Sequence, residues 1–96
     1  MNSRQRAYLI GLASNQEPIL QIGKNALSPQ VAEAVRECFN THELIKINVL
    51  KNCMDDLQKI ARVLSERTGS EPIKVIGRKI ILYKENKDNK KIELPK

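Results

Sequence analysis

The chain has few of the residues that build catalytic or metal centres. Its 96 residues include two cysteines, one histidine and no tryptophan, and aromatic residues make up 3% of the sequence. Cys38, Cys53 and His42 form no cluster with metal-ligand spacing. The acidic residues are scattered along expected helices or lie near the C-terminus, so no paired-carboxylate site is evident. We therefore predict a protein that is not an enzyme and that uses no cofactor, metal or small-molecule substrate.

Long apolar segments are also missing. No run approaches the roughly 20 apolar residues of a membrane-spanning helix, and the segment Met1–Arg6 lacks the apolar centre of a signal peptide. The sequence therefore predicts a cytoplasmic protein that does not enter a membrane. In that compartment Cys38 and Cys53 are expected to be free thiols, although a single disulfide between them stays open.

Positive charge is what the chain has in excess. Seventeen lysine and arginine residues against eleven acidic residues give a formal net charge of +6 and a pI near 9.6. Such a balance favours a polyanionic partner, either nucleic acid or an acidic membrane surface. The length corresponds to one domain with a small core.

The most informative segment joins a short apolar run to the start of a helix. The run Ile19–Ile22 ends at a glycine, and Ser28 and Pro29 are a typical N-cap and first helical residue. Loop N–H groups of Gly23–Ala26 and the positive end of the helix dipole would point into the same space, where Lys24 adds a charge. This joint is suited to hold a phosphate group.

Hydrophobic periodicity predicts three helices and four strands. The expected helices are residues 3–14, 29 to about 40, and a third that is capped by Asn52, carries Met54 and Leu57 on its apolar stripe, and closes at Arg67 and Gly69. The expected strands are Ile19–Ile22, Glu43–Lys51, Ile73–Ile76 and Lys79–Tyr83. Gly77-Arg78 suits a type II′ hairpin between the last two strands.

This order predicts an α/β fold, a small two-layer mixed four-stranded sheet with three helices in the order α-β-α-β-α-β-β. The two crossover helices make the first three strands parallel if they are neighbours, and the hairpin adds an antiparallel strand. Polar strand residues predict that one face of the sheet is less completely buried: Gln21, Lys46, Asn48 and Lys74. We expect one domain over residues 1–84 and a polar, flexible C-terminal tail over residues 85–96 that cannot bury enough apolar surface to fold.

Four short segments, taken together in their order and spacing, resemble a known family. They are Gln21–Asn25, Glu43–Lys46, Val75–Arg78 and Ile81–Lys84, within a match from Arg6 to Pro95. The chain resembles YhbY-type proteins, which are single CRM (chloroplast RNA splicing and ribosome maturation) domains. The resemblance implies a fold similar to the C-terminal domain of bacterial translation initiation factor three. It also implies RNA binding associated with assembly of the large ribosomal subunit.

The sequence departs from the family pattern at three places. The family loop usually reads Gly-x-x-Gly, and here Ala26 stands at the last position. An alanine at positive φ would be strained, so either Ala26 has an ordinary conformation or the loop is altered. The first helix of the family often carries Leu-Arg and Ala-His, where this chain has Leu9-Ile10 and Ala13-Ser14.

The candidate RNA-binding residues are the loop Gly23, Lys24, Asn25 and Ala26, widened by Arg4, Arg6, Lys46 and Arg78. Each has a structural alternative. The glycine can simply allow a strand to turn into a helix, the other loop residues and the helix arginines can be solvated, Lys46 can be a plain solvent-face lysine, and Arg78 can serve the hairpin alone.

Base stacking contributes little to the expected mechanism, because only Tyr8, Phe39 and Tyr83 are aromatic and Phe39 lies on an apolar helix face. We therefore expect a monomer that contacts phosphates and the shape of structured ribosomal RNA in pre-large-subunit particles. An adaptor that docks on acidic ribosomal or assembly proteins is the alternative. Weak, sequence-independent DNA binding is a third.

Overall fold

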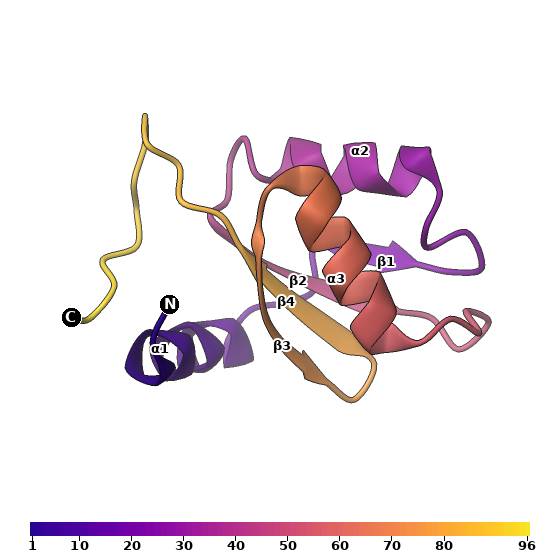
Figure 1. The fold of residues 1–96 in the computed structure, drawn as a ribbon, viewed down its shortest axis with the longest axis horizontal. Helices are drawn as coiled ribbons and strands as arrows, with labels where there is room; N and C mark the ends of the chain where they lie inside the picture. Colours follow the sequence, from indigo (N-terminus) through magenta and orange to yellow (C-terminus); the bar gives the residue numbers. More distant parts are fainter.

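The computed structural model describes all 96 residues (Figure 1). Its elements are α1 (Ser3–Ser14), β1 (Leu20–Ile22), α2 (Pro29–Cys38), β2 (Leu44–Val49), α3 (Leu57–Thr68), β3 (Glu71–Ile76) and β4 (Lys79–Tyr83). The expected α/β class and element order are confirmed. None of the helices combines the length and the apolar character needed to cross a membrane.

The four strands form one mixed sheet in the order β1-β2-β4-β3. β1 pairs in parallel with β2, whereas β4 pairs antiparallel with both β2 and β3. The first three strands therefore run in one direction, but β4 lies between β2 and β3. Their carboxyl ends meet at one edge of the sheet, which is formed by segments 23–28 and 50–56 and by the turn at 77–78. We call this the carboxyl edge.

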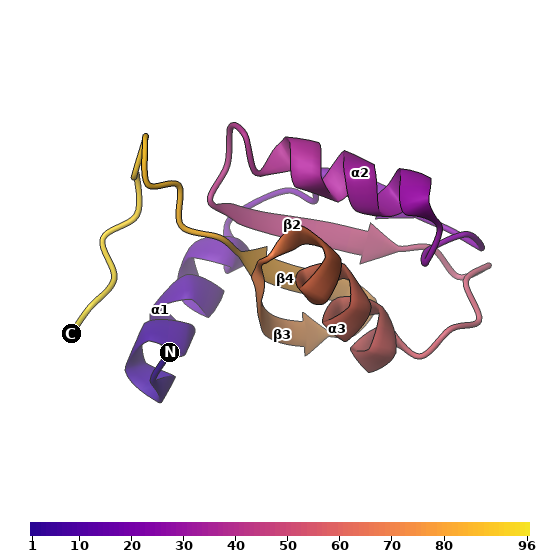
Figure 2. The same cartoon turned by 45° about the horizontal axis from the view of Figure 1, so that its top comes forward.

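Helices cover the two faces of the sheet unequally. α2 and α3 pack on one face, where the larger core cluster includes Val35, Ile47, Leu64 and Ile80. α1 packs on the opposite face through a smaller cluster that includes Leu9. Figure 2 shows α1 apart from α2 and α3, at the end of the sheet where β2 begins. The expected layer of helices on a sheet is present, and α1 adds a partial cover to the other side.

The strand register confirms the less buried face. Gln21 pairs with Asn48, and Lys46 pairs with Ile81, so these residues share the face that α1 covers only in part. Their neighbours along each strand face α2 and α3, because side chains alternate. The register of β3 shifts between Pro72 and Lys74, so Lys74 lies beside this irregularity at the outer edge of the sheet.

Most element ends agree with the sequence, and the start of α3 does not. Ser28 caps α2 and Gly69 ends α3 with φ 69°, as predicted. The N-cap of α3 is Asp56, whose side chain accepts from the Gln58 N–H, rather than Asn52. Met54 is 92% exposed and contributes nothing to the core. Segment 50–56 is instead a connection between β2 and α3. Its first residue continues the pairing with β1, because the Leu50 N–H donates to the Ile22 carbonyl at 2.8 Å.

The C-terminal segment has no helix or strand, yet it contacts the domain. Glu43 is 3% exposed, and its carboxylate accepts from the N–H groups of Asn86 (2.8 Å), Lys91 (2.6 Å) and Ile92 (2.8 Å). Ile92 and Leu94 pack against the cluster around α1. The composition did not predict these apolar contacts. The domain boundary at residue 84 and the flexibility of the tail stay predictions.

Candidate nucleic-acid interface

The loop between β1 and α2 is held at several points. The Ser28 hydroxyl accepts from the Val31 N–H at 3.3 Å, and the Ser28 N–H donates to the Asn25 carbonyl at 3.0 Å. From α3, the Arg67 guanidinium donates to the Leu27 carbonyl at 2.6 Å. The cap was predictable from Ser28, whereas the contact with α3 required the fold. The loop is therefore presented in a defined conformation.

Gly23 lies close to a side chain of another loop. Its φ is not positive, so the position does not require a glycine for backbone freedom. A Cβ at this position would lie 3.0 Å from Oδ1 and 3.4 Å from Nδ2 of Asn52. The glycine therefore lets segment 50–56 pack against the loop at the carboxyl edge.

Ala26 does not belong to the surface. It has no exposed area and lies in the larger core cluster, and no residue other than glycine has a positive φ. The departure from the family glycine therefore causes no backbone strain. As a contact residue the prediction of Ala26 is wrong, because a side chain turned into the core anchors the loop and cannot reach RNA.

Lys24 and Asn25 are the exposed residues at the tip of the loop. Neither side chain makes a hydrogen bond or an ion pair within the protein; the Asn25 carbonyl alone accepts the bond from Ser28. Arg4 is an exposed residue of α1, about 20 positions before the loop in the sequence, and its side chain also has no partner within the protein. These three side chains remain available to a ligand.

Arg6 binds the fold rather than facing outward. Its Nη1 donates to the carbonyls of Pro72 (2.9 Å) and Ile73 (2.8 Å), and its Nη2 lies 3.5 Å from Glu71 Oε1. The guanidinium therefore fastens α1 to β3. Its predicted role in widening the contact surface is replaced by this structural role.

Lys46 is also bound within the protein, at the C-terminal end of α1. Its Nζ donates to the carbonyls of Ala13 (3.1 Å) and Gln16 (3.2 Å). The last carbonyls of a helix lack intrahelical partners and carry the negative end of its dipole, so a cation stabilises them. Lys46 is thus a helix cap, neither a free solvent-face lysine nor an available contact.

Arg78 joins the hairpin turn to segment 50–56. Its Nε donates to the Val49 carbonyl at 2.9 Å, and its Nη2 donates to the carbonyls of Leu50 (2.8 Å) and Cys53 (3.2 Å). These bonds give Arg78 a structural role, and its contact with RNA stays a prediction. Positive φ at Gly77 (58°) and not at Arg78 agrees with the predicted type II′ turn.

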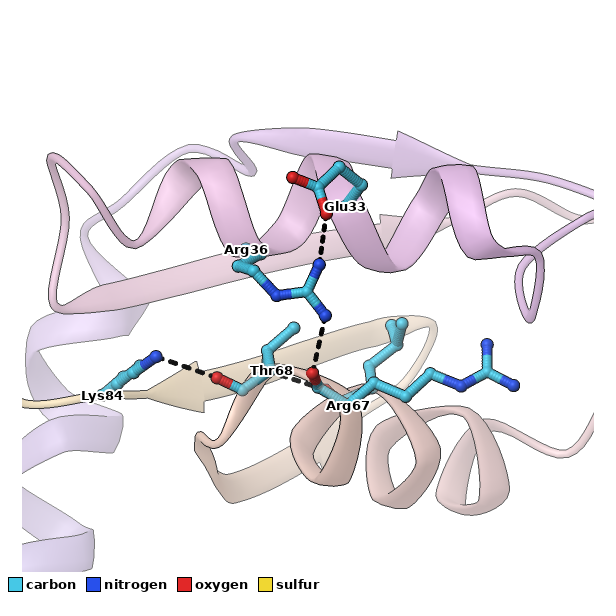
Figure 3. A network of polar contacts seen from close by, with 6 residues as sticks. Glu33, Arg36, Arg67, Thr68 and Lys84 are labelled. Atoms are coloured by element: carbon cyan, nitrogen blue, oxygen red, sulfur yellow. Dashed lines mark hydrogen bonds and ion pairs between the residues drawn. The ribbon is translucent and has the colours of Figure 1, made fainter.

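The same use of cations recurs where α3 ends (Figure 3). Arg36 of α2 pairs with Glu33 and donates to the Arg67 carbonyl at 2.8 Å, while the Lys84 ammonium donates to the Thr68 carbonyl at 3.0 Å. These charges still add to the positive field of the molecule. Each of them, however, already binds a carbonyl within the protein, and Arg36 also pairs with Glu33, so a high lysine and arginine count overstates the number of free contacts.

Sequence reasoning missed several cations that the structure leaves free. These residues are exposed, and their side chains make no hydrogen bond or ion pair within the protein: Lys51, Lys59, Arg62, Lys74 and Lys79. Lys51 lies beside Asn52, next to the Gly23 loop, so it extends the charge of Lys24 along the carboxyl edge. Its position after β2 was the available signal, because β1 and β2 are parallel and end at the same edge.

The groups that could do chemistry are poorly suited to it. No cluster of three or more histidine, cysteine or acidic residues could hold a metal ion. Cys38 and Cys53 are both free thiols. Burial, with a smaller contribution from Glu37, raises the pKa of the Cys38 thiol, which keeps it protonated and weakly nucleophilic.

Comparison with known proteins gives the family of the chain. The CRS1/YhbY (CRM) domain matches residues 1–84. The chain belongs to this family. A Bacillus subtilis relative, named probable RNA-binding protein YqeI, is 37% identical over 95 residues, which cover 99% of each chain. A relative from Haemophilus influenzae, named RNA-binding protein, is 29% identical over 96 residues, covering 100% of this chain and 96% of that one.

A solved CRM structure has the same fold. It is the solution structure of a Staphylococcus aureus protein described as a candidate RNA-binding protein. The two chains are 43% identical and superpose with a TM-score of 0.83, over 99% of each. Family and relatives are named for RNA binding and not for catalysis.

Proposed function

We propose that this CRM-domain protein is an RNA-binding protein that contacts structured ribosomal RNA during assembly of the large ribosomal subunit. The observation that carries the proposal is the loop of Lys24 and Asn25. It is fixed at its base by Ala26, Ser28 and Arg67, and its tip is exposed and unpartnered. A preorganised cationic loop loses little conformational entropy when it binds a phosphate.

The mode of recognition follows from the aromatic residues. Phe39 and Tyr83 are each 6% exposed, and Tyr8 is the single aromatic side chain at the surface. Proteins that read single strands stack successive bases on several exposed aromatics. This protein instead engages backbone phosphates and the shape of a folded RNA. It acts as a monomer, in the cytoplasm, where bacterial ribosomes assemble.

The test compares a loop variant with a matched control. Lys24→Gln removes the loop charge, and Lys87→Gln removes an equally exposed, unpartnered charge in the C-terminal segment. We expect only Lys24→Gln to weaken cosedimentation of the folded protein with pre-large-subunit particles. Equal effects of the two variants would exclude the loop as the site.

Salt and nuclease treatment separate RNA binding from the adaptor alternative. If about four to six phosphates are neutralised, log K should fall against log salt with a slope of about −3 to −5. Binding should survive mild protease treatment of the particles and be lost with ribonuclease. A slope near zero, or the opposite pattern of survival, would favour docking on an acidic protein.

A further inference from the structure

We propose that a groove at the outer edge of the sheet, between α3 and β3, is a second binding site for RNA backbone. The groove has a volume of about 650 Å³, and four cationic residues and one acidic residue line it. β3 is the edge strand opposite to β1, so this groove is separate from the Gly23 loop. The inference rests on the proposed function and adds a second phosphate-contacting surface to it.

Three of the four cations are free to bind a ligand. Lys59 and Arg62 are one helical turn apart on α3, and Lys74 lines the groove from β3. All three are exposed and have no internal partner. Arg6, the fourth, is bound to carbonyls of β3. The groove therefore holds unused donors, in contrast to the occupied cations Lys46 and Arg78.

Lys59 lies near the start of α3 without an ion-pair partner. Asp56 is the N-cap of α3, so Lys59 lies in the first helical turn, near the positive end of the helix dipole. A lysine there is slightly unfavourable for the isolated helix, and the Asp56 carboxylate at the cap offsets part of this cost. The Lys59 ammonium group makes no bond within the protein and is available to an anion.

The remaining lining is one acidic residue and an apolar floor. The carboxylate of Asp56 accepts from the Gln58 N–H at 3.0 Å and offsets one of the four positive charges of the groove. Ala61, Ile73 and Val75 provide an apolar floor. Low-dielectric walls beneath surface cations concentrate their field in the groove.

One RNA can reach both surfaces. Strands lie about 4.8 Å apart, so the β1 and β3 edges of this sheet are about 15 Å from each other. Segment 50–56 leads from the carboxyl edge directly to the start of α3 and carries the free Lys51 between the two sites. The cations thus form a path across the carboxyl edge into the groove.

Pro72 and Lys74 also fit a different role, protection of an edge strand against pairing with another chain. That role accounts for residues on β3 alone. It gives no reason for Lys59 and Arg62, which lie on the helix across the groove.

The experiment uses the full chain and a fluorescein-labelled RNA hairpin with single-stranded arms. Four proteins are compared: wild type, Lys59→Gln/Arg62→Gln for the groove, Lys24→Gln for the loop, and Lys87→Gln as the control. A glutamine near a helix start is well tolerated, and melting curves establish that each variant is folded. Because the groove variant lacks two phosphate-binding cations, it should bind about 20- to 60-fold more weakly in 0.1 M salt, with a salt slope shallower by about 1.5 to 2.

Each outcome decides between the sites. Weaker binding by both the groove and the loop variants, with photo-crosslinks from 4-thiouridine RNA to peptides of α3 or β3, supports the second site. Wild-type affinity of the groove variant alongside weak binding by the loop variant overturns the groove and leaves the proposed function intact. Absence of RNA binding by the wild type overturns both. If the groove variant loses binding to polyglutamate but keeps RNA affinity, the groove is a protein-docking surface and the proposal is wrong.

Discussion

At the scale of single residues, neither end of the Gly23–Ala26 loop has the positive φ that a glycine motif suggests. Gly23 has an ordinary φ and lies close to the Asn52 side chain. Ala26 has no exposed surface and belongs to the core. The loop therefore exposes Lys24 and Asn25 above a buried alanine.

Replacing Ala26 with glycine should destabilise the domain. A glycine adds unfolded-state entropy, about 0.5–1 kcal/mol, and one buried methyl group is worth about 0.8 kcal/mol. We expect Ala26→Gly to lower the free energy of unfolding by about 1.5 kcal/mol and to leave RNA affinity nearly unchanged. Denaturant titration measures the first quantity; a gain in stability would mean that Ala26 is strained.

Gly23 can be tested with a double-mutant cycle that includes its neighbour. At an ordinary φ, Gly→Ala stabilises a protein by about 0.4–1 kcal/mol through the unfolded state. We expect this full gain when Gly23→Ala is made in an Asn52→Ala background, and a smaller one in the wild type, where Cβ meets the amide at 3.0 Å. Equal gains in urea titrations of the two pairs would refute the contact.

At the scale of elements, cations that bind carbonyls join neighbouring segments. Arg6 fastens α1 to β3, Lys46 caps α1 from β2, and Arg78 ties the hairpin turn to segment 50–56. Arg36 and Lys84 do the same for the end of α3 (Figure 3). Arg67 is a sixth cation of this kind, and its bond fixes the loop. Three of these six side chains, Arg6, Lys46 and Arg78, are ones that sequence inspection assigns to RNA.

Arg78→Met should affect stability more than RNA affinity. It removes the donor to three carbonyls, and the loss of hydrogen bonds from a charged group costs about 1–3 kcal/mol. Lys79→Met is the matched control, since Lys79 is exposed and unpartnered, and its effect on stability should stay within about 0.5 kcal/mol. In thermal melts and RNA titrations, a stable Arg78→Met variant that binds RNA much more weakly than Lys79→Met would contradict this assignment.

At the scale of the whole molecule, the C-terminal segment is linked to the domain by one buried carboxylate. Burial alone would raise the pKa of Glu43, but hydrogen bonds from the N–H groups of Asn86, Lys91 and Ile92, helped by Lys90, outweigh it and hold the pKa below its usual 4.5. A carboxyl group whose pKa is lower in the folded protein than in the unfolded chain stabilises the folded state at pH values above the unfolded-state pKa. That contribution is lost as the pH falls through the folded value.

Glu43→Gln should therefore have a pH-dependent effect. The amide replaces one of the two acceptor oxygens with an NH2 donor, which then faces at least one of the three N–H groups. We expect this change to lower the free energy of unfolding by about 2 kcal/mol at pH 7. The difference from wild type should shrink as the pH falls below about 4.5, first because the carboxyl group of the unfolded chain binds a proton and, at lower pH, because the native carboxylate does so as well. Glu37→Gln, an exposed change on α2, provides the comparison in unfolding titrations across this range. A difference that grows toward low pH would show that Glu43 is not the anchor.

Local signals in the sequence determined the order of the elements, most of their ends and the joint between β1 and α2. Periodicity, the Ser28 cap, the Gly69 stop and the hairpin glycine act within a few residues, so they can be recognised without the fold. The start of α3 was misplaced because Asn52 and Asp56 are both capable caps, and in the structure it is Asp56 that accepts from the Gln58 N–H.

The number of lysines and arginines was also set by the sequence, but their roles were decided only by the tertiary structure. Arg6, Lys46 and Arg78 find their carbonyl acceptors 67, 33 and 29 positions away in the chain. Pairs so far apart produce no periodic pattern in the sequence. A lysine that caps a helix therefore cannot be distinguished there from one that is free to bind a phosphate. The fold removes these three from the candidate surface, leaves Arg4, Lys24 and Asn25 available, and exposes Lys51, Lys59, Arg62 and Lys74. The physical reason is that a donor's availability depends on which carbonyls the packed chain brings within its reach.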